Sequence, residues 1–196
     1  MISAIVLAAG ESRRMGEAKQ LLPWEGKTVL GHVLDTLLSS SVQEVILVLG
    51  HEAERVLEKV AIREIKVVFN PDYQKGMSAS LRRGLMAMNP AAEAFLVFLA
   101  DQPAITPEII DQLIDSFRRA RPGKSIVVPS FGGRRGHPVL FGRKYREEFG
   151  GLTGEVGGRE ILARHPEDIL ELEMDTDAVL TDLDTPEDYQ SHSGRK

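Results

Sequence analysis

The chain of 196 residues contains no cysteine. It can therefore form neither a disulfide framework nor a metal site built from thiolates. The absence of cysteine also fits a reducing compartment, where disulfides rarely persist. We expect a fold that its hydrophobic core stabilises unaided, since a chain of this length buries about 70% of the surface that its unfolded form exposes.

A surplus of basic residues is also missing, because the formal net charge is −5. Non-specific nucleic-acid binders usually carry a positive surplus, so we expect small-molecule partners and no nucleic acid. This net charge still allows a local basic pocket for phosphates. The apolar run Met1–Leu7 is too short to span a membrane, and no basic region precedes it as in a signal peptide. We therefore expect a cytoplasmic protein without a membrane anchor.

The composition itself is that of an ordinary soluble domain. Hydrophobic residues make up 42% of the chain and charged residues 27%, close to the average for globular proteins. The sequence shows no internal repeat, low-complexity tract or clear linker. We predict a single domain over residues 1–190, followed by a flexible polar tail over residues 191–196.

Short apolar runs alternate with helical patterns along the first two-thirds of the chain. Strands are predicted over residues 2–7, 45–49, 65–69 and 95–99, and helices over residues 28–38, 52–60, 78–88 and from 106 onward. This alternation predicts an α/β fold of three layers, α/β/α, with a mostly parallel, Rossmann-like sheet. Residues 126–128 and 139–141 are predicted as strands of an antiparallel excursion. Ligands of such sheets bind beyond the carboxyl ends of the strands.

The loop after the first strand combines small residues with positive charge. Ala8, Ala9 and Gly10 let backbone N–H groups approach a phosphate, and the loop adds Arg14 and Lys19. It contains neither the Walker pattern nor the dinucleotide fingerprint of glycines. A tight turn with solvated charges and a phosphate site are both compatible with these residues. The candidates for a nucleotide site here are Leu7, Ala8, Ala9, Gly10, Arg14 and Lys19.

A second candidate segment follows the third predicted strand and precedes a helix. It contains Gly76, Ser78 and Ser80. Either serine can cap the helix, and either can face a nucleotide at the helix N-terminus. The two roles are compatible, because one serine can cap while the other binds.

Acidic residues occupy two further positions. Asp101 follows the fourth strand, where a carboxylate is well placed to hold Mg²⁺ beside phosphates, and Thr106 already serves as the cap of the next helix. A second metal ligand is expected from Asp182 or Asp184. Asp184 and Thr185 can instead cap the following helix, so the sequence slightly favours Asp182 as the ligand.

The remaining candidate segment is rich in glycine and arginine. Residues 132–138 contain His137 and are typical of a surface turn when taken alone. A lone histidine is weak evidence for a binding site. Residues 154–159 form a second glycine-rich segment, which ends at Arg159.

Residues 7–23 read L-A-A-G-x-S-x-R-M-G-x-x-K-x-L-L-P. This pattern resembles the signature loop of the molybdenum-cofactor nucleotidyltransferases, the MobA-like family, and is most similar to its cytidylyltransferase (MocA-like) branch. The guanylyltransferase branch typically has a second glycine where this chain has Ala9. The segments around Ser78, Asp101, Asp182 and Arg159 resemble further motifs of the family.

The resemblance implies a nucleotide-diphospho-sugar transferase fold and transfer of CMP from CTP to molybdopterin, with Mg²⁺ or Mn²⁺ and release of pyrophosphate. It implies Arg14, Lys19 and Asp101 as catalytic residues, and His137 and Arg159 as acceptor-binding residues. A molybdoenzyme is implied as protein partner. The chain departs from the family at Glu155, where aspartate is usual, and mildly at Ala100. The alternatives are transfer to another phosphate acceptor, such as GTP or a sugar or alcohol phosphate, and a non-catalytic cofactor-delivery protein.

Overall fold

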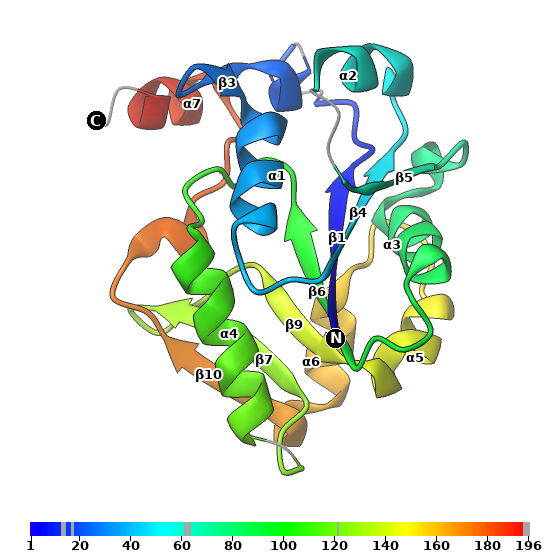
Figure 1. Cartoon of the computed structure of the whole chain (residues 1–196), viewed down its shortest axis with the longest axis vertical. Coiled ribbons are helices and arrows are strands. Elements are labelled where there is room, and N and C mark those ends of the chain that lie inside the picture. Colours follow the sequence, from blue (N-terminus) through cyan, green and yellow to red (C-terminus); the bar gives the residue numbers. More distant parts are fainter. Residues whose placement is uncertain (13–14, 17, 61–63, 121, 194–196) are drawn as a thin grey trace.

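The computed structural model describes residues 1–12, 15–16, 18–60, 64–120 and 122–193 (Figure 1). The strands are β1 (Ile2–Ala8), β2 (Pro23–Trp24), β3 (Lys27–Thr28), β4 (Glu44–Leu49), β5 (Lys66–Phe69), β6 (Ala94–Leu99), β7 (Ile126–Phe131), β8 (Arg134–Arg135), β9 (Val139–Gly142) and β10 (Ile169–Glu173). The α-helices are α1 (Val29–Leu38), α2 (Ala53–Lys59), α3 (Met77–Ala87), α4 (Pro107–Ala120), α5 (Arg146–Gly150), α6 (Gly158–Arg164) and α7 (Pro186–Ser193). The short 3₁₀ helices are η1 (Lys19–Leu21), η2 (Tyr73–Lys75), η3 (Arg143–Tyr145), η4 (Pro166–Asp168) and η5 (Asp177–Leu180).

The main sheet has the strand order β10-β7-β9-β6-β1-β4-β5, with β8 paired to β7. β1 lies at its centre and pairs in parallel with both β4 and β6. β9 runs antiparallel to β6 and to β7, so it is the expected antiparallel excursion. The continuous apolar runs of β1, β4 and β6 are explained by this position, because both faces of the central strands are buried.

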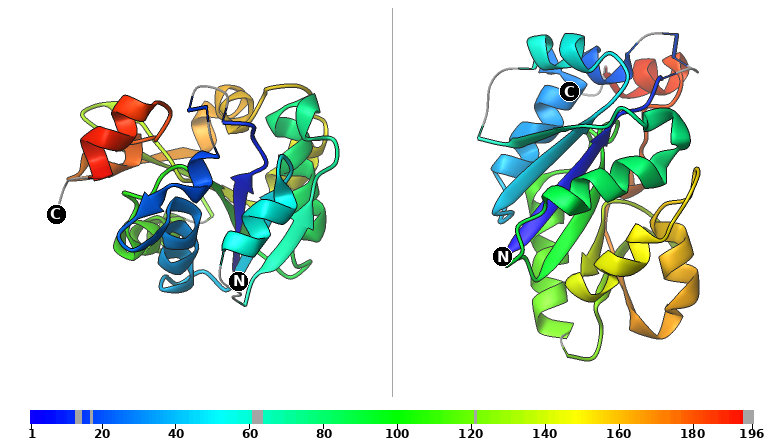
Figure 2. Two further views of the ribbon diagram at one scale, coloured as in Figure 1. Left: turned by 90° about the horizontal axis from the view of Figure 1, so that it is seen from above. Right: turned by 90° about the vertical axis from the view of Figure 1, so that its right-hand side faces the viewer.

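Helices cover both faces of the sheet. Side chains of α1, α2 and α4 pack with one face, and those of α3, α5 and α6 pack with the other. The two layers lie on opposite sides of the sheet in the right-hand view of Figure 2. The predicted three-layer α/β/α fold with a mostly parallel sheet is confirmed. Within the described ranges, no helix has the length and apolarity needed to cross a lipid bilayer.

Several elements differ from the sequence prediction or were not predicted, and β10 and the chain's polar tail are two of them. β10 pairs in parallel with β7 at the edge of the sheet, and only one of its residues, Ile169, is buried. An edge strand of this kind lacks the continuous apolar run that marks the central strands. The tail predicted from residue 191 is helical as far as Ser193, where α7 ends. Residues 194–196 lie outside the described residues.

Candidate nucleotide-binding site

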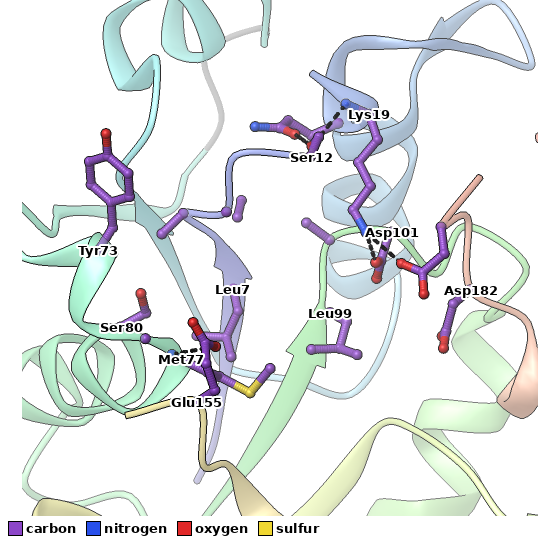
Figure 3. A pocket seen from close by; sticks show the side chains of 17 residues that line it. Leu7, Ser12, Lys19, Tyr73, Met77, Ser80, Leu99, Asp101, Glu155 and Asp182 are labelled. Carbon is purple, nitrogen blue, oxygen red and sulfur yellow. Dashed lines mark hydrogen bonds and ion pairs between the residues drawn. The ribbon is translucent and has the colours of Figure 1, made fainter. Parts of the chain in front are cut away.

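The carboxyl ends of β1, β4 and β6 point to one edge of the sheet, at the top of Figure 1. A cavity of about 380 Å³ lies at this edge and is drawn in Figure 3. We call it the donor cavity, after the nucleotide donor that the sequence resemblance implies. Its lining residues come from the first loop, η1, the start of α3, the end of β6 and the segment before α7: among them are Leu7, Ala8, Ala9, Gly10, Lys19, Gly76, Ser80 and Asp101. Most candidate residues of the first loop are therefore brought together with those that follow β5 and β6.

Lys19 links two of the candidate acids. Its ammonium group donates to Asp101 and lies 3.1 Å from Oδ1 of Asp184. The 3₁₀ helix η1 positions the lysine, and the hydroxyl of Ser12 accepts a hydrogen bond of 3.2 Å from the Lys19 backbone N–H. Burial disfavours the charged form of Lys19, but the two carboxylates outweigh burial and raise its pKa above the ordinary value. The lysine is therefore a cation at neutral pH.

Asp182 belongs to the same cluster. Its Oδ1 accepts a hydrogen bond of 2.5 Å from the side-chain amide of Gln102, and Leu183 N–H donates to the Asp101 carbonyl at 3.0 Å. This backbone bond fixes the segment 182–184 beside the end of β6. Burial and the neighbouring carboxylate of Asp101 raise the pKa of Asp182, while the bond from Gln102 opposes the rise. The three aspartates therefore form a region of concentrated negative charge.

Of the two residues expected as possible caps of α7, Thr185 is the one seen to cap it. Thr185 Oγ1 accepts from the N–H of Asp188 at 3.2 Å, and Asp188 Oδ2 accepts from the N–H groups of Thr185 and Asp184. This reciprocal pair is a capping box, which satisfies the first amides of the helix. The carboxylate of Asp184 turns towards Lys19 instead. The sequence argument for preferring Asp182 over Asp184 as a metal ligand therefore no longer holds.

The carboxylate oxygens of this cluster suit a divalent cation. Oδ2 of Asp101 accepts from Lys19, whereas its buried Oδ1 has no hydrogen-bond partner within the described part of the chain. An unpartnered buried carboxylate oxygen is costly unless a cation or donor reaches it. Among the described residues no group of three acidic or histidine side chains already forms a metal cage. Mg²⁺ needs no such cage, because it typically uses one or two carboxylates together with substrate phosphates.

The N-terminus of α3 closes another side of the donor cavity. Gly76 is its N-cap residue and has φ = +99°. Neither Ser78 nor Ser80 therefore caps the helix, and the expectation that one of these serines is the cap is wrong. Ser80 lines the cavity, whereas Ser78 is fully buried and does not. The backbone N–H of Ser78 donates to Gly154 at 3.2 Å, which joins the start of α3 to the loop before α6.

A second, larger cavity of about 680 Å³ adjoins the first, and we call it the acceptor cavity. His137 and Arg159 both line it, on elements far apart in the sequence. The N–H of His137 donates to Val179 at 2.9 Å, which holds this segment against η5. Burial, and then the charge of Arg159, lower the pKa of His137, so its ring is neutral at pH 7. Asp182 and Glu155 line both cavities and form a shared wall.

The structure adds residues to which the sequence analysis assigned no role. Tyr73 lines the donor cavity across from Lys19 in Figure 3, and its hydroxyl lies 3.4 Å from Nδ1 of His51. The carboxylate of Glu155 accepts from the Met77 N–H at 3.3 Å. The position of Tyr73 shortly after a strand end was the available signal, since ligands bind at that edge. Arg14, a candidate phosphate ligand, lies outside the described residues.

The chain is similar to known proteins over almost its whole length. The chain is 30% identical to the molybdenum cofactor cytidylyltransferase of Escherichia coli, with 96% of this chain and 93% of that protein covered. It is 29% identical to nicotine blue oxidoreductase of Paenarthrobacter nicotinovorans, over 95% of this chain and 93% of the relative. The manganese complex of Rv0371c from Mycobacterium tuberculosis superposes with a TM-score of 0.83, at 32% identity, over 98% of this chain and 97% of that one.

The two relatives are named for different activities, so sequence identity alone does not decide the substrate. The model of the MobA-like NTP transferase domain matches residues 4–169, which include the first loop, Asp101 and both acceptor-side candidates. On this match and on the assembled site, the chain is a nucleotidyltransferase and belongs to the MobA-like NTP transferase family.

Proposed function

We propose that this protein transfers CMP from CTP to the phosphate of molybdopterin and releases pyrophosphate. One observation carries the proposal: Lys19, Asp101 and Asp184 form a charged cluster at the end of β6, beside a cavity for the donor and next to a cavity for the acceptor. Phosphoryl and nucleotidyl transfer depend mainly on positioning and charge neutralisation, and the cluster offers both.

The roles follow from the placement of the residues. The backbone N–H groups of the first loop and the ammonium of Lys19 bind the triphosphate. Asp101, with Asp182 or Asp184, would hold Mg²⁺ or Mn²⁺, which neutralises phosphate charge when bound. An oxygen of the acceptor phosphate attacks the α-phosphorus, and the bond from that phosphorus to the pyrophosphate oxygen breaks. The acceptor phosphate is ionised at neutral pH, so the step requires no general base.

The acceptor side supports a phosphate-bearing substrate. Arg159 supplies a positive charge to the acceptor cavity, and neutral His137 supplies a ring that can hydrogen-bond a polar group. The size of the cavity, about 680 Å³, is in the range of cavities that hold small molecules. We further propose that a molybdoenzyme receives the product.

The choice of CTP rests on Ala9, where the guanylyltransferase branch typically has glycine, and on the likeness to the E. coli cytidylyltransferase. The test measures pyrophosphate release with each of the four triphosphates, with and without molybdopterin, in Mg²⁺ and in EDTA. We expect release only with CTP, molybdopterin and Mg²⁺ together. Turnover with another triphosphate or acceptor would contradict this choice, and binding without turnover would indicate a delivery protein.

The same assay identifies the second metal ligand. D182N and D184N are titrated separately with Mg²⁺, since Asp182 is bonded to Gln102 and Asp184 to Lys19. The variant whose half-saturating Mg²⁺ concentration rises more has lost the ligand. Equal and small changes in both variants would contradict a two-carboxylate site.

A further inference from the structure

Asn70 is a buried polar residue at the carboxyl edge of the sheet, outside the charged cluster. Its exposed fraction is 1%, and it directly follows β5. Its backbone N–H donates to the Leu49 carbonyl at 2.7 Å, so its main chain is fixed to the end of β4. The polar atoms of a buried side-chain amide of this kind normally each have a hydrogen-bond partner.

The orientation of the Asn70 amide follows from its surroundings. One of its atoms lies 3.1 Å from the backbone N of Asp72, which can only donate, so that atom is the carbonyl oxygen Oδ1. The NH₂ group therefore faces the other way and donates to Oγ of Ser80 at 3.0 Å. The turn at residues 70–72 thus determines which end of the amide meets Ser80.

The orientation of the Asn70 amide determines where the hydroxyl proton of Ser80 can point. Its oxygen accepts from Asn70, so its own proton must point elsewhere, and no acceptor for that proton is found among the described residues. Ser80 is 5% exposed and lines the donor cavity beside Tyr73 and Gly76, as Figure 3 shows for Ser80 and Tyr73. The hydroxyl is consequently available to the cavity as a donor.

We propose that Asn70 is a positioning residue that fixes Ser80 as a hydrogen-bond donor to an acceptor atom of the bound nucleoside triphosphate. The inference rests on the proposed function only in taking the donor cavity as the triphosphate site. Asn70 does not touch the nucleotide itself. It acts by occupying the acceptor side of the Ser80 hydroxyl, which leaves the proton for the ligand.

The substitution N70D reverses this polarity at nearly constant shape. The aspartate keeps an oxygen for the Asp72 N–H, but its second oxygen accepts where the amide donated. The Ser80 proton then turns to the carboxylate and is withdrawn from the cavity. N89D is the matched control, because Oδ1 of Asn89 also accepts from the N–H two residues onward, at Ala91, away from the donor cavity.

The experiment compares N70D, S80A, the double variant and N89D in steady-state turnover and in thermal unfolding. We expect N70D and S80A each to raise KM for the triphosphate about tenfold, the scale of one hydrogen bond, with kcat changed less than twofold. The double variant should match S80A alone, because N70D acts through the Ser80 hydroxyl. N89D should match the wild type.

Two results would overturn the inference. One is an unchanged KM in N70D, and the other is a double variant whose KM is the product of the two single effects, as expected for a direct charge effect. Calorimetric titration with the triphosphate replaces KM for any variant whose melting temperature falls. The measurements use whichever triphosphate the wild type turns over, so failure with CTP contradicts the proposed function and leaves the role of Asn70 under test.

Discussion

At the scale of single residues, the site is organised by compensation between opposite charges. Lys19 bridges Asp101 and Asp184, so each carboxylate has a cation beside it before any substrate binds. Such a partly buried arrangement depends on all its members, since removing one leaves the others uncompensated. Substitutions here therefore need isosteric replacements that change charge and little else.

The first prediction concerns Asp101. D101N keeps the size of the side chain but removes the charge that we propose to hold Mg²⁺, so kcat should fall by at least about 100-fold. The measurement is pyrophosphate release at saturating Mg²⁺, with thermal unfolding alongside. D115N, on the outer side of α4, is the control and should keep full activity, since the Asp115 carboxylate is exposed. A fully active D101N would remove Asp101 from the mechanism.

The sequence indicated some of these residues and not others, for physical reasons. Asp101 was recognisable because it follows a buried strand at the edge where ligands bind. The hydrogen bond between Asn70 and Ser80 could not be recognised in the sequence, because it depends on how η2 and α3 fold back after β5. The argument for preferring Asp182 over Asp184 fails because Thr185 and Asp188 satisfy the helix end between themselves, and the choice of metal ligand stays a prediction.

At the scale of elements, the loop 154–157 and the start of α3 depend on close backbone contact. Gly76 has φ = +99°, and a Cβ atom there would lie 2.4 Å from the backbone carbonyl carbon and oxygen of Gly154. The N–H groups of Met77 and Ser78 bind the same loop. Because this loop borders both cavities, its position affects donor and acceptor together.

The second prediction is that G76A destabilises the protein by about 1–3 kcal/mol and raises KM for the triphosphate. The alanine is strained at this φ and forces loop 154–157 away. Chemical denaturation and steady-state kinetics measure the two effects. G26A is the control, since Gly26 also has positive φ but has open space around it. Equal effects of the two substitutions would show that backbone strain acts without the clash.

The third prediction concerns pH and the contact of η3 with the end of η4. Asp168 accepts from Lys144 and from the hydroxyl of Tyr145. These bonds, Lys144 first, lower the pKa of Asp168 against the opposing effect of burial. The unfolded chain then binds its proton at a higher pH than the folded one, so this stability is present above pH 4 and is lost on acidification.

D168N should therefore reduce the free energy of unfolding by about 1 kcal/mol at pH 7, because Lys144 is largely exposed and its pairing is screened. The difference from the wild type should shrink as the pH falls towards 3. Urea denaturation at both pH values measures it. A difference that stays constant with pH would contradict the assigned role of the carboxylate charge.

The elements themselves were predicted where the sequence carries a regular apolar pattern. The strands β1, β4, β5 and β6 and the helices between them follow from continuous apolar runs and helical spacing. The half-exposed edge strand β10 was missed, because its pairing with β7 spans forty residues or so of chain and leaves little periodic signal. Long-range pairing of this kind is decided by the whole sheet.

At the scale of the whole molecule, the proposed function places the two substrates in separate cavities. The donor cavity lies over β1 and β6, and the acceptor cavity extends from β6 towards β7, β9 and α6. Arg159 lines the acceptor cavity and does not line the donor cavity. Under the proposed function each substrate therefore has its own set of contacts, with a common boundary at Asp182 and Glu155.

The fourth prediction follows from this separation. R159A should raise KM for the acceptor about tenfold to 100-fold, the loss of one charge-assisted bond, and leave KM for the triphosphate unchanged. Kinetics with each substrate varied in turn measures the effect. R118A, which removes an exposed arginine on α4, serves as control. Equal increases in both KM values would place Arg159 at the donor side instead.

The wall formed by Asp182 and Glu155 has a consequence for the end of the cycle. In the proposed transfer, the product joins the nucleotide and the pterin, so one molecule fills both cavities across this wall. It keeps the contacts of two substrates while losing translational and rotational freedom only once. We therefore expect the enzyme to hold this product more tightly than either reactant, and release of the product to limit the rate of turnover unless a receiving protein accelerates it.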